Sequence, residues 1–142
     1  MDDLNRRFSG VFTALITPFN DGAIDFEAFD ALVERQLEAG VAGLVPVGTA
    51  GDAATLSEEE ADELIARTVK RTAGRALVMA GAGANDTKKT VEKVKRAEKA
   101  GADAVLIVTP YYNKPTQAGL IAHYGAAAEA TSLPVMLYSV PG

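Results

Sequence analysis

The sequence contains no cysteine, which excludes disulfides, a thiol nucleophile and cysteine-bound zinc. A cytoplasmic location, indifferent to disulfide chemistry, is therefore expected. A basic stripe is also missing: 14 Lys and Arg are scattered among 19 Asp and Glu, for a net charge of −5, which disfavours binding to nucleic acid. No apolar run approaches the roughly 20 residues of a membrane-spanning helix, and the opening MDDLNRRFSG lacks the apolar core of a signal peptide. Neither a membrane nor export is expected.

What the sequence does contain is an alternation of apolar and amphipathic segments, typical of strands joined by crossover helices in a parallel sheet. Its 142 residues suit a single domain with a core of its own. Five continuously apolar segments, as expected for strands covered on both faces, are predicted as strands: 11–19, 43–48, 76–81, 104–112 and 134–140. Four helices separate them, with N-caps predicted at Asp25, Ser57, Asp86 or Thr87, and Thr116.

Two junctions, LEAGVAGLVPVG and EKAGADAVLIVT, resemble copies of one helix–glycine–strand joint, centred on Gly40 and Gly101. They indicate a repeated βα unit. The resulting order β-α-β-α-β-α-β-α-β fits two architectures, a five-stranded doubly wound sheet or the first part of an eight-unit barrel. In both, ligands bind at the carboxyl ends of the parallel strands.

The helix that follows Thr116 is the least clearly patterned of the four. The residues predicted to face the core are Leu120, Ile121, Tyr124 and Ala127. His123 is expected at the surface, away from the strand ends. On the preceding helix, the lysines at 88, 89, 93, 95 and 99 are expected to form a solvated face.

Two glycine-rich segments follow predicted strands. In GTAGD, Gly48 and Gly51 flank Thr49 and Ala50, so backbone N–H groups could turn toward an anion such as a carboxylate, and the Thr49 hydroxyl could pass a proton. A plain tight turn explains the same residues. The segment GAGAND lacks the third glycine of a dinucleotide fingerprint, since position 86 is Asp, so packing is the favoured interpretation.

Paired tyrosines stand between two prolines in TPYYNKP, after the strand predicted to end near residue 112. Proline cannot join an interior ladder, so Tyr111 and Tyr112 are expected at the strand's carboxyl end. They could relay protons or anchor a subunit contact, and the pattern alone favours the contact. Tyr138 ends another strand at the same rim, where a hydroxyl cluster of Thr49, Tyr112 and Tyr138 can form. No metal ligand set or cofactor motif is expected.

Five motifs in order, GVFTALITPF, GTAGDAATLS, AGAGAN, TPYYNKPTQAGL and LYSVPG, carry a family resemblance over essentially the whole chain. The sequence resembles the dihydrodipicolinate synthase branch of the pyruvate-dependent class I aldolases, whose relatives include N-acetylneuraminate lyase. The YYNKP form points to the synthase branch. The resemblance implies a (β/α)₈ barrel and a lyase of lysine biosynthesis, without a cofactor. In that reaction pyruvate, held as a Schiff base on a lysine, is joined to aspartate semialdehyde.

Carried over by position, the resemblance assigns roles to the residues at the strand ends. Thr49, Tyr112 and Tyr138 would form a proton relay, with Tyr112 reaching into the site of a neighbouring subunit. Backbone N–H groups of the segment Gly48, Thr49, Ala50 and Gly51 would hold the pyruvate carboxylate. Tyr111 would pack at a dimer interface, so a homo-oligomer is expected.

The chain departs from the family pattern where members usually read GTTGES and this sequence reads GTAGDA. Ala50 keeps the backbone donor but lacks a hydroxyl, and a hydrogen bond to a charged group is worth roughly 1.5–3 kcal/mol. Asp52 shortens the usual Glu, and Ala53 removes another hydroxyl. Weaker pyruvate binding is therefore expected.

A further departure concerns the nucleophile. The sequence reaches Gly142 before the strand that bears the family's Schiff-base lysine, so residues 1–142 are interpreted as the N-terminal part of the barrel, about (βα)₄β, and inactive alone. Such a partial barrel cannot close and is expected to self-associate to cover its open edges. The alternatives are a non-catalytic scaffold module, another pyruvate aldolase, or a receiver-like or flavodoxin-like domain, which this chain resembles least because it has neither clustered acids nor a phosphate loop.

Overall fold

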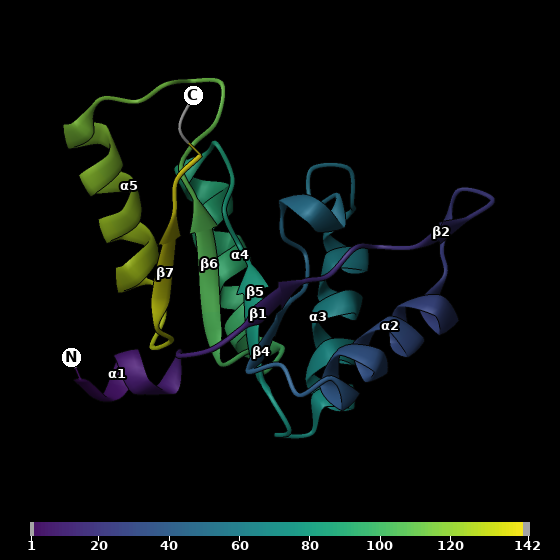
Figure 1. Cartoon of the computed structure of the whole chain (residues 1–142). Helices are drawn as coiled ribbons and strands as arrows, with labels where there is room; N and C mark the ends of the chain where they lie inside the picture. Colours follow the sequence, from purple (N-terminus) through teal and green to yellow (C-terminus); the bar gives the residue numbers. More distant parts are fainter. Residues whose placement is uncertain (1, 141–142) are drawn as a thin grey trace.

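The computed structural model describes residues 2–140, and its centre is a parallel sheet of five strands in the order β1-β4-β5-β6-β7. These strands are β1 (Phe12–Ala14), β4 (Gly43–Val45), β5 (Leu77–Gly81), β6 (Ala104–Val108) and β7 (Val135–Tyr138). Their spatial order follows their order along the chain, as in consecutive strands of a barrel, whereas a doubly wound sheet reverses its order at a switch point. This order agrees with the barrel prediction and not with the doubly wound alternative. Figure 1 shows the open sheet with its connecting helices.

Four helices connect these strands: α2 (Phe26–Glu38), α3 (Glu58–Thr72), α4 (Thr87–Lys99) and α5 (Gln117–Glu129). Each begins at a predicted cap, because the side chains of Asp25, Ser57, Asp86 and Thr116 accept hydrogen bonds from backbone N–H groups of the first turn. Ser57 and Glu60 complete a reciprocal capping box. The predicted helix starts are therefore confirmed, with Asp86 rather than Thr87 as the third cap.

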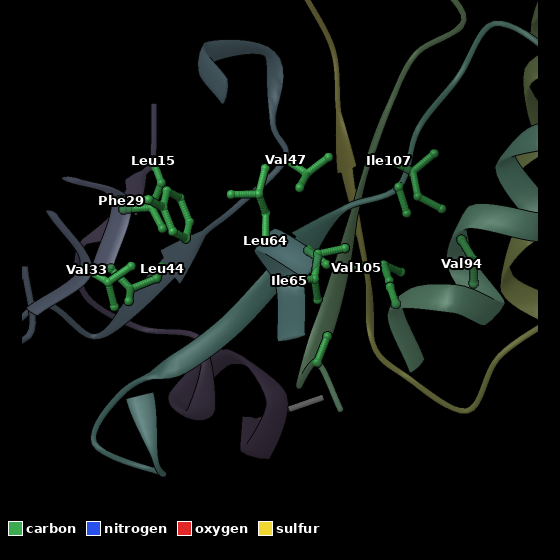
Figure 2. Close-up of a cluster of buried hydrophobic side chains, with 14 of the residues drawn as sticks. Leu15, Phe29, Val33, Leu44, Val47, Leu64, Ile65, Val94, Val105 and Ile107 are labelled. Atoms are coloured by element: carbon green, nitrogen blue, oxygen red, sulfur yellow. The ribbon is translucent and has the colours of Figure 1, made fainter. Parts of the chain in front are cut away.

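The main core lies between one face of the sheet and these helices. Its buried side chains come from strands, from the residues that follow them and from helices, and Figure 2 labels ten of them: Leu15, Phe29, Val33, Leu44, Val47, Leu64, Ile65, Val94, Val105 and Ile107. Each of the helices α2 to α5 follows a strand and packs back on the same face, as right-handed crossovers require.

The opposite face of the sheet is open. Side chains from all five strands, Ala14, Val45, Met79, Leu106 and Met136, line a depression of about 420 Å³ on it. Phe8 and Phe12 partly fill it, next to the short helix α1 (Asp2–Arg7). Within residues 2–140, β1 and β7 each pair with one neighbour only, so both outer edges of the sheet lack a partner strand.

The strands are shorter than the apolar segments that predicted them. The segment 11–19 forms only β1, and Phe19 begins a separate hairpin of β2 (Phe19–Asn20) and β3 (Ala23–Ile24), which projects from the side of the sheet far from α5 (Figure 1). Strands β4 and β6 stop at Val45 and Val108 instead of 48 and 112. Pro46 and Pro110 follow these ends closely, and a proline has no N–H to continue a ladder.

Helix α5 contradicts two expectations. Ile121 is 74% exposed, whereas His123, predicted at the surface, is only 4% exposed. The His123 Nδ1 atom lies 2.9 Å from the Thr87 hydroxyl oxygen at the start of α4. The sequence QAGLIAHYGAAAE is apolar or small on every side, so no single stripe marks the face that packs. Among residues 2–140, no helix combines the length and apolarity needed to cross a membrane.

Candidate active site

The carboxyl ends of four neighbouring strands surround a cavity of about 410 Å³. Thr49 follows β4, Gly81 ends β5, Leu106 and Val108 belong to β6, and Tyr138 ends β7, and all of them line this cavity. We call it the rim cavity. Its position is the one that parallel βα folds use for ligands.

The segment from Gly48 to Gly51 forms a single tight 3₁₀ turn beside the rim cavity. The Gly51 N–H donates to the Gly48 carbonyl (3.0 Å), and the Asp52 N–H donates to the Thr49 carbonyl (3.3 Å). In this turn the Gly51 N–H is used within the chain, and the expected carboxylate cradle of Gly48 to Gly51 stays a prediction. The N–H groups of Thr49 and Ala50 begin the turn and have no partner within it.

This turn is held against the end of β1 by a residue that the pattern did not single out. The Thr17 hydroxyl donates to the Gly51 carbonyl (2.7 Å), and Thr17 is only 6% exposed. A Cβ atom on Gly51 would meet the Leu15 carbonyl oxygen at 2.8 Å. The sequence offers one signal for this role, a threonine within the apolar segment ITPF. Its partner could not be predicted, because it is 34 residues away in sequence.

The glycines of the second segment serve packing, as the sequence predicted. A Cβ atom on Gly81 would lie 2.0 Å from the Val47 carbonyl oxygen, and one on Gly83 would lie 2.5 Å from the Val108 nitrogen. Both glycines therefore allow the ends of adjacent strands to approach closely. They also line the rim cavity, so this close approach shapes its wall.

The predicted hydroxyl cluster is only partly assembled within this chain. Thr49 and Tyr138 line the rim cavity together, and Tyr138 is 38% exposed. Tyr112 is not among the residues that line the cavity and is 94% exposed. Tyr111, expected at a subunit contact, lines the cavity and is half exposed.

The loop that carries the two tyrosines is anchored to the next loop along the rim. The Asn113 side chain donates to the Asn85 carbonyl (2.8 Å), and the Asn113 N–H donates to the Tyr111 carbonyl (2.9 Å). Tyr112 has a φ of 69° and Lys114 a φ of 47°, both in the left-handed region. With the backbone in this conformation, the Tyr112 side chain is exposed and does not line the cavity of its own chain.

A cationic side chain also reaches the rim cavity. Lys93 on α4 was predicted on a solvated face, but it is half-buried and lines both the rim cavity and a smaller adjacent pocket. Nearby, Arg96 is paired with Asp62 and Glu58, and its hydrogen bond with Asp62 raises its pKa further. Within the described residues, no group of three or more His, Asp or Glu side chains is arranged to hold a metal ion.

The profile of the dihydrodipicolinate synthetase family matches residues 7–142. The chain belongs to this family. A relative called 4-hydroxy-tetrahydrodipicolinate synthase, from Maridesulfovibrio salexigens, is 56% identical over 135 residues, which are 95% of this chain and 46% of that protein. The chain thus spans about half the length of the curated relatives it matches.

Solved structures of the family have the same fold over the matched part. The dihydrodipicolinate synthase of Thermotoga maritima is 49% identical, with a TM-score of 0.93 over 96% of this chain and 46% of its own. A chloride-inhibited family member from Acinetobacter baumannii, solved in complex with pyruvate, is 48% identical, with a TM-score of 0.91 over 94% of this chain and 46% of its own. The five strands are therefore part of a (β/α)₈ barrel of the dihydrodipicolinate synthetase family.

Proposed function

We propose that residues 1–142 are the N-terminal part, a single domain, of a 4-hydroxy-tetrahydrodipicolinate synthase. This lyase of lysine biosynthesis joins pyruvate, bound as a Schiff base to a lysine, with aspartate semialdehyde, and a cytoplasmic location is part of the proposal. The observation that carries the proposal is the placement of Thr49 and Tyr138 on one cavity at the carboxyl ends of the strands. The identity to relatives of that name supports it.

Each residue of the site has a role in this proposal. The N–H groups of Thr49 and Ala50, at the open start of the 3₁₀ turn, bind the pyruvate carboxylate. The hydroxyls of Thr49 and Tyr138 move protons between the reacting groups. Tyr112, exposed and turned outward, completes the relay of a second subunit, and Tyr111 packs near that contact.

The proposal includes inactivity of this chain alone. Schiff-base chemistry needs a lysine amine aimed at the reacting carbonyl. Among residues 2–140, no lysine lies on a strand or directly at a strand's carboxyl end, Lys93 belongs to α4, and Lys114 is exposed on a loop. The open rim cavity and unpaired edges also leave the reacting groups in contact with water.

Borohydride trapping with pyruvate tests this inactivity. Reduction fixes any imine as a covalent adduct, which intact-protein mass spectrometry detects. We expect no adduct on the 142-residue chain and a stoichiometric adduct on the Thermotoga maritima synthase treated in parallel. An adduct on this chain would overturn the claim, and its loss in Lys93→Arg would assign it to the amine that lines the rim cavity.

A chimera tests the synthase activity itself. It joins residues 1–142 to the remaining part of the Thermotoga maritima synthase, which is 49% identical to this chain over the matched part. We expect imine formation and condensation, with kcat lowered about 100-fold or more in Thr49→Val and Tyr138→Phe, since positioned proton transfer contributes about 10²–10⁴-fold. The control Thr72→Val removes a buried hydroxyl without a partner in the described chain and should leave kcat unchanged. A folded chimera without condensation activity would refute the proposal.

A second candidate is a non-catalytic module that self-associates through its open sheet. The exposed apolar side chains of β7, Met136 (42%) and Leu137 (57%), favour it specifically. The two candidates differ in whether residues 1–142 contribute to catalysis, and condensation activity of the chimera, with its loss in Thr49→Val and Tyr138→Phe, separates them.

A further inference from the structure

Three hydrogen bonds meet at the end of β7. The Thr109 N–H donates to the Tyr138 carbonyl (2.8 Å), and the Thr109 hydroxyl donates to the same oxygen (3.1 Å). The Tyr124 hydroxyl, from α5, lies 2.9 Å from the Thr109 hydroxyl oxygen. Thr109 follows β6 directly, so these bonds join β6, β7 and α5 at the rim.

The chemistry of the groups fixes the direction of these bonds. A carbonyl oxygen only accepts, so the single hydrogen of the Thr109 hydroxyl is committed to Tyr138. The remaining bond must then be donated by the Tyr124 hydroxyl to the Thr109 oxygen. The result is a directed chain from Tyr124 through Thr109 to the Tyr138 carbonyl, whose two lone pairs are both used.

Tyr138 needs such a restraint more than the other rim residues do. It is the last residue of β7, a strand with one paired neighbour in the described chain, and its side chain lines the rim cavity. The other wall residues, such as Gly81, end strands that are paired on both sides. An end held by a single ladder bond would fray, and the Tyr138 ring would move with it.

We infer that Thr109 and Tyr124 are positioning residues that fix the end of β7 and thereby the Tyr138 ring. Thr109 contributes through its hydroxyl and Tyr124 through the bond that orients this hydroxyl. The meaning of this restraint for catalysis rests on the proposed function, whereas the restraint itself rests on the geometry alone. Neither residue is expected to touch substrate.

NMR of the 142-residue chain tests the inference without substrate. The four tyrosines give separate ring signals in a ¹³C-tyrosine sample, assigned by single Tyr→Phe changes. In Thr109→Val, which keeps the shape and removes the hydroxyl, we expect the Tyr138 ring signal to shift and broaden and the Thr109 amide to exchange about tenfold faster, as for a lost bond of about 1.4 kcal/mol. Tyr124→Phe should change the same Tyr138 and Thr109 signals.

Two controls make the test specific. Thr109→Ser keeps the hydroxyl and should restore the Tyr138 signal and the slow exchange of residue 109. Thr72→Val makes the same change at a hydroxyl on α3 that has no partner in the described chain and should leave Tyr138 unchanged. Circular dichroism checks that each variant is folded, and if Thr109→Val is not, Tyr124→Phe decides.

The inference is overturned if the Tyr138 signal and the Thr109 exchange are unchanged in the folded variants, or if Thr109→Ser behaves like Thr109→Val. This readout involves neither pyruvate nor turnover. A chimera that fails to condense pyruvate while the NMR changes appear would refute the proposed function and leave the positioning role intact. Unchanged NMR signals with an active chimera would do the reverse.

Discussion

At the scale of single residues, the shape of the rim depends on close contacts between backbone segments, which a residue with a Cβ atom would prevent. Val47 has a φ of 56°, which is rare for a β-branched residue and costs about 1–3 kcal/mol. The Gly81 N–H donates to the Pro46 carbonyl (2.9 Å), and the missing Cβ of Gly81 leaves room for the Val47 carbonyl. Gly81 thus supports the strained entry into the Gly48 turn.

Gly81→Ala should therefore damage both stability and the turn. Its Cβ would collide with backbone atoms of Val47 and Gly48, which cannot rotate away. We expect the free energy of unfolding, measured by urea denaturation, to fall by about 1–3 kcal/mol. Gly125→Ala is the matched control, because a Cβ there meets nothing within 4 Å and α5 should gain about 0.5–1 kcal/mol. Equal effects of the two changes would contradict the role assigned to Gly81.

His123 makes stability depend on pH. Burial lowers its pKa, an effect that the nearby Asp86 carboxylate partly opposes, and its buried Nε2 has no hydrogen-bond partner within residues 2–140. The folded pKa lies below the ordinary value of 6.5, so the unfolded chain binds more protons between these two values. The stabilisation is complete above about pH 6.5 and is lost as pH falls from there toward the folded pKa.

The free energy of unfolding, measured with urea between about pH 5 and 7.5, should rise with pH. This window covers the ordinary histidine range. His123 is the chain's one histidine, so His123→Gln should flatten the slope in this window. Three carboxyl groups also have lowered pKa values: Asp30, Glu34 and Glu98. They change stability only below about their ordinary values of 3.8 to 4.5, so they do not contribute to the slope in this window. A slope that persists in His123→Gln would contradict the assignment.

At the scale of elements, α2 and α3 are joined by one largely buried carboxylate. Asp30 on α2 accepts hydrogen bonds from Arg67 (3.0 and 3.2 Å) and Arg71 (2.9 Å) on α3. Partial burial raises the pKa of Asp30, but the hydrogen bonds from the two arginines outweigh it and hold the pKa below its usual value. The charged form is therefore the one that links the two helices.

Asp30→Asn should weaken this link. It removes the charge while keeping the shape, and two arginines lose their main acceptor, so we expect unfolding to become easier by about 1–3 kcal/mol. Glu63→Gln, which alters an exposed partner of the same Arg67, should change stability by less than about 1 kcal/mol. Urea denaturation of the two variants side by side provides the measurement, and a larger loss for Glu63→Gln would refute this ranking.

The helices and strands also show how much of the fold could be predicted from the sequence. Caps and apolar stripes act over a few residues, so the helices that begin after Asp25 and Ser57 could be predicted. The β2–β3 hairpin was missed although Asp21 and Gly22, with φ of 49° and 82°, are a typical Asp-Gly turn. The apolar segment 11–19, which precedes this turn, was interpreted as one strand ending at Phe19, so the hairpin that begins there was not recognised.

The candidate site likewise has some features that local sequence predicts and others that it does not. Strand ends are local, so Thr49 and Tyr138 could be placed at one rim from sequence. The bond from Thr17 to the turn and the link from Tyr124 through Thr109 depend on contacts between distant segments, which no local pattern encodes. The face of α5 that buries His123 was likewise decided by packing against α4, not by periodicity.

At the scale of the whole molecule, the sheet is covered on one face and open on the other. The open face presents apolar side chains from all five strands around a depression of about 420 Å³, and both outer strands have unpaired edges within residues 2–140. In a closed barrel these groups face inward and pair with further strands. For the isolated chain, a second copy is the partner that is always present and that carries the same apolar face and unpaired edges.

The isolated chain should therefore self-associate, and light scattering after size exclusion should give a mass above the 14.8 kDa of one chain. Met136→Lys places a charge on β7 within the open depression and should shift the distribution toward the monomer, because burying an unpaired ammonium is costly. Ile121→Lys adds the same charge on the solvent side of α5, where the side chain is already 74% exposed, and should not change the mass. If the unaltered chain is monomeric at micromolar concentration, or if both lysine variants dissociate it equally, the open face is not what holds the copies together.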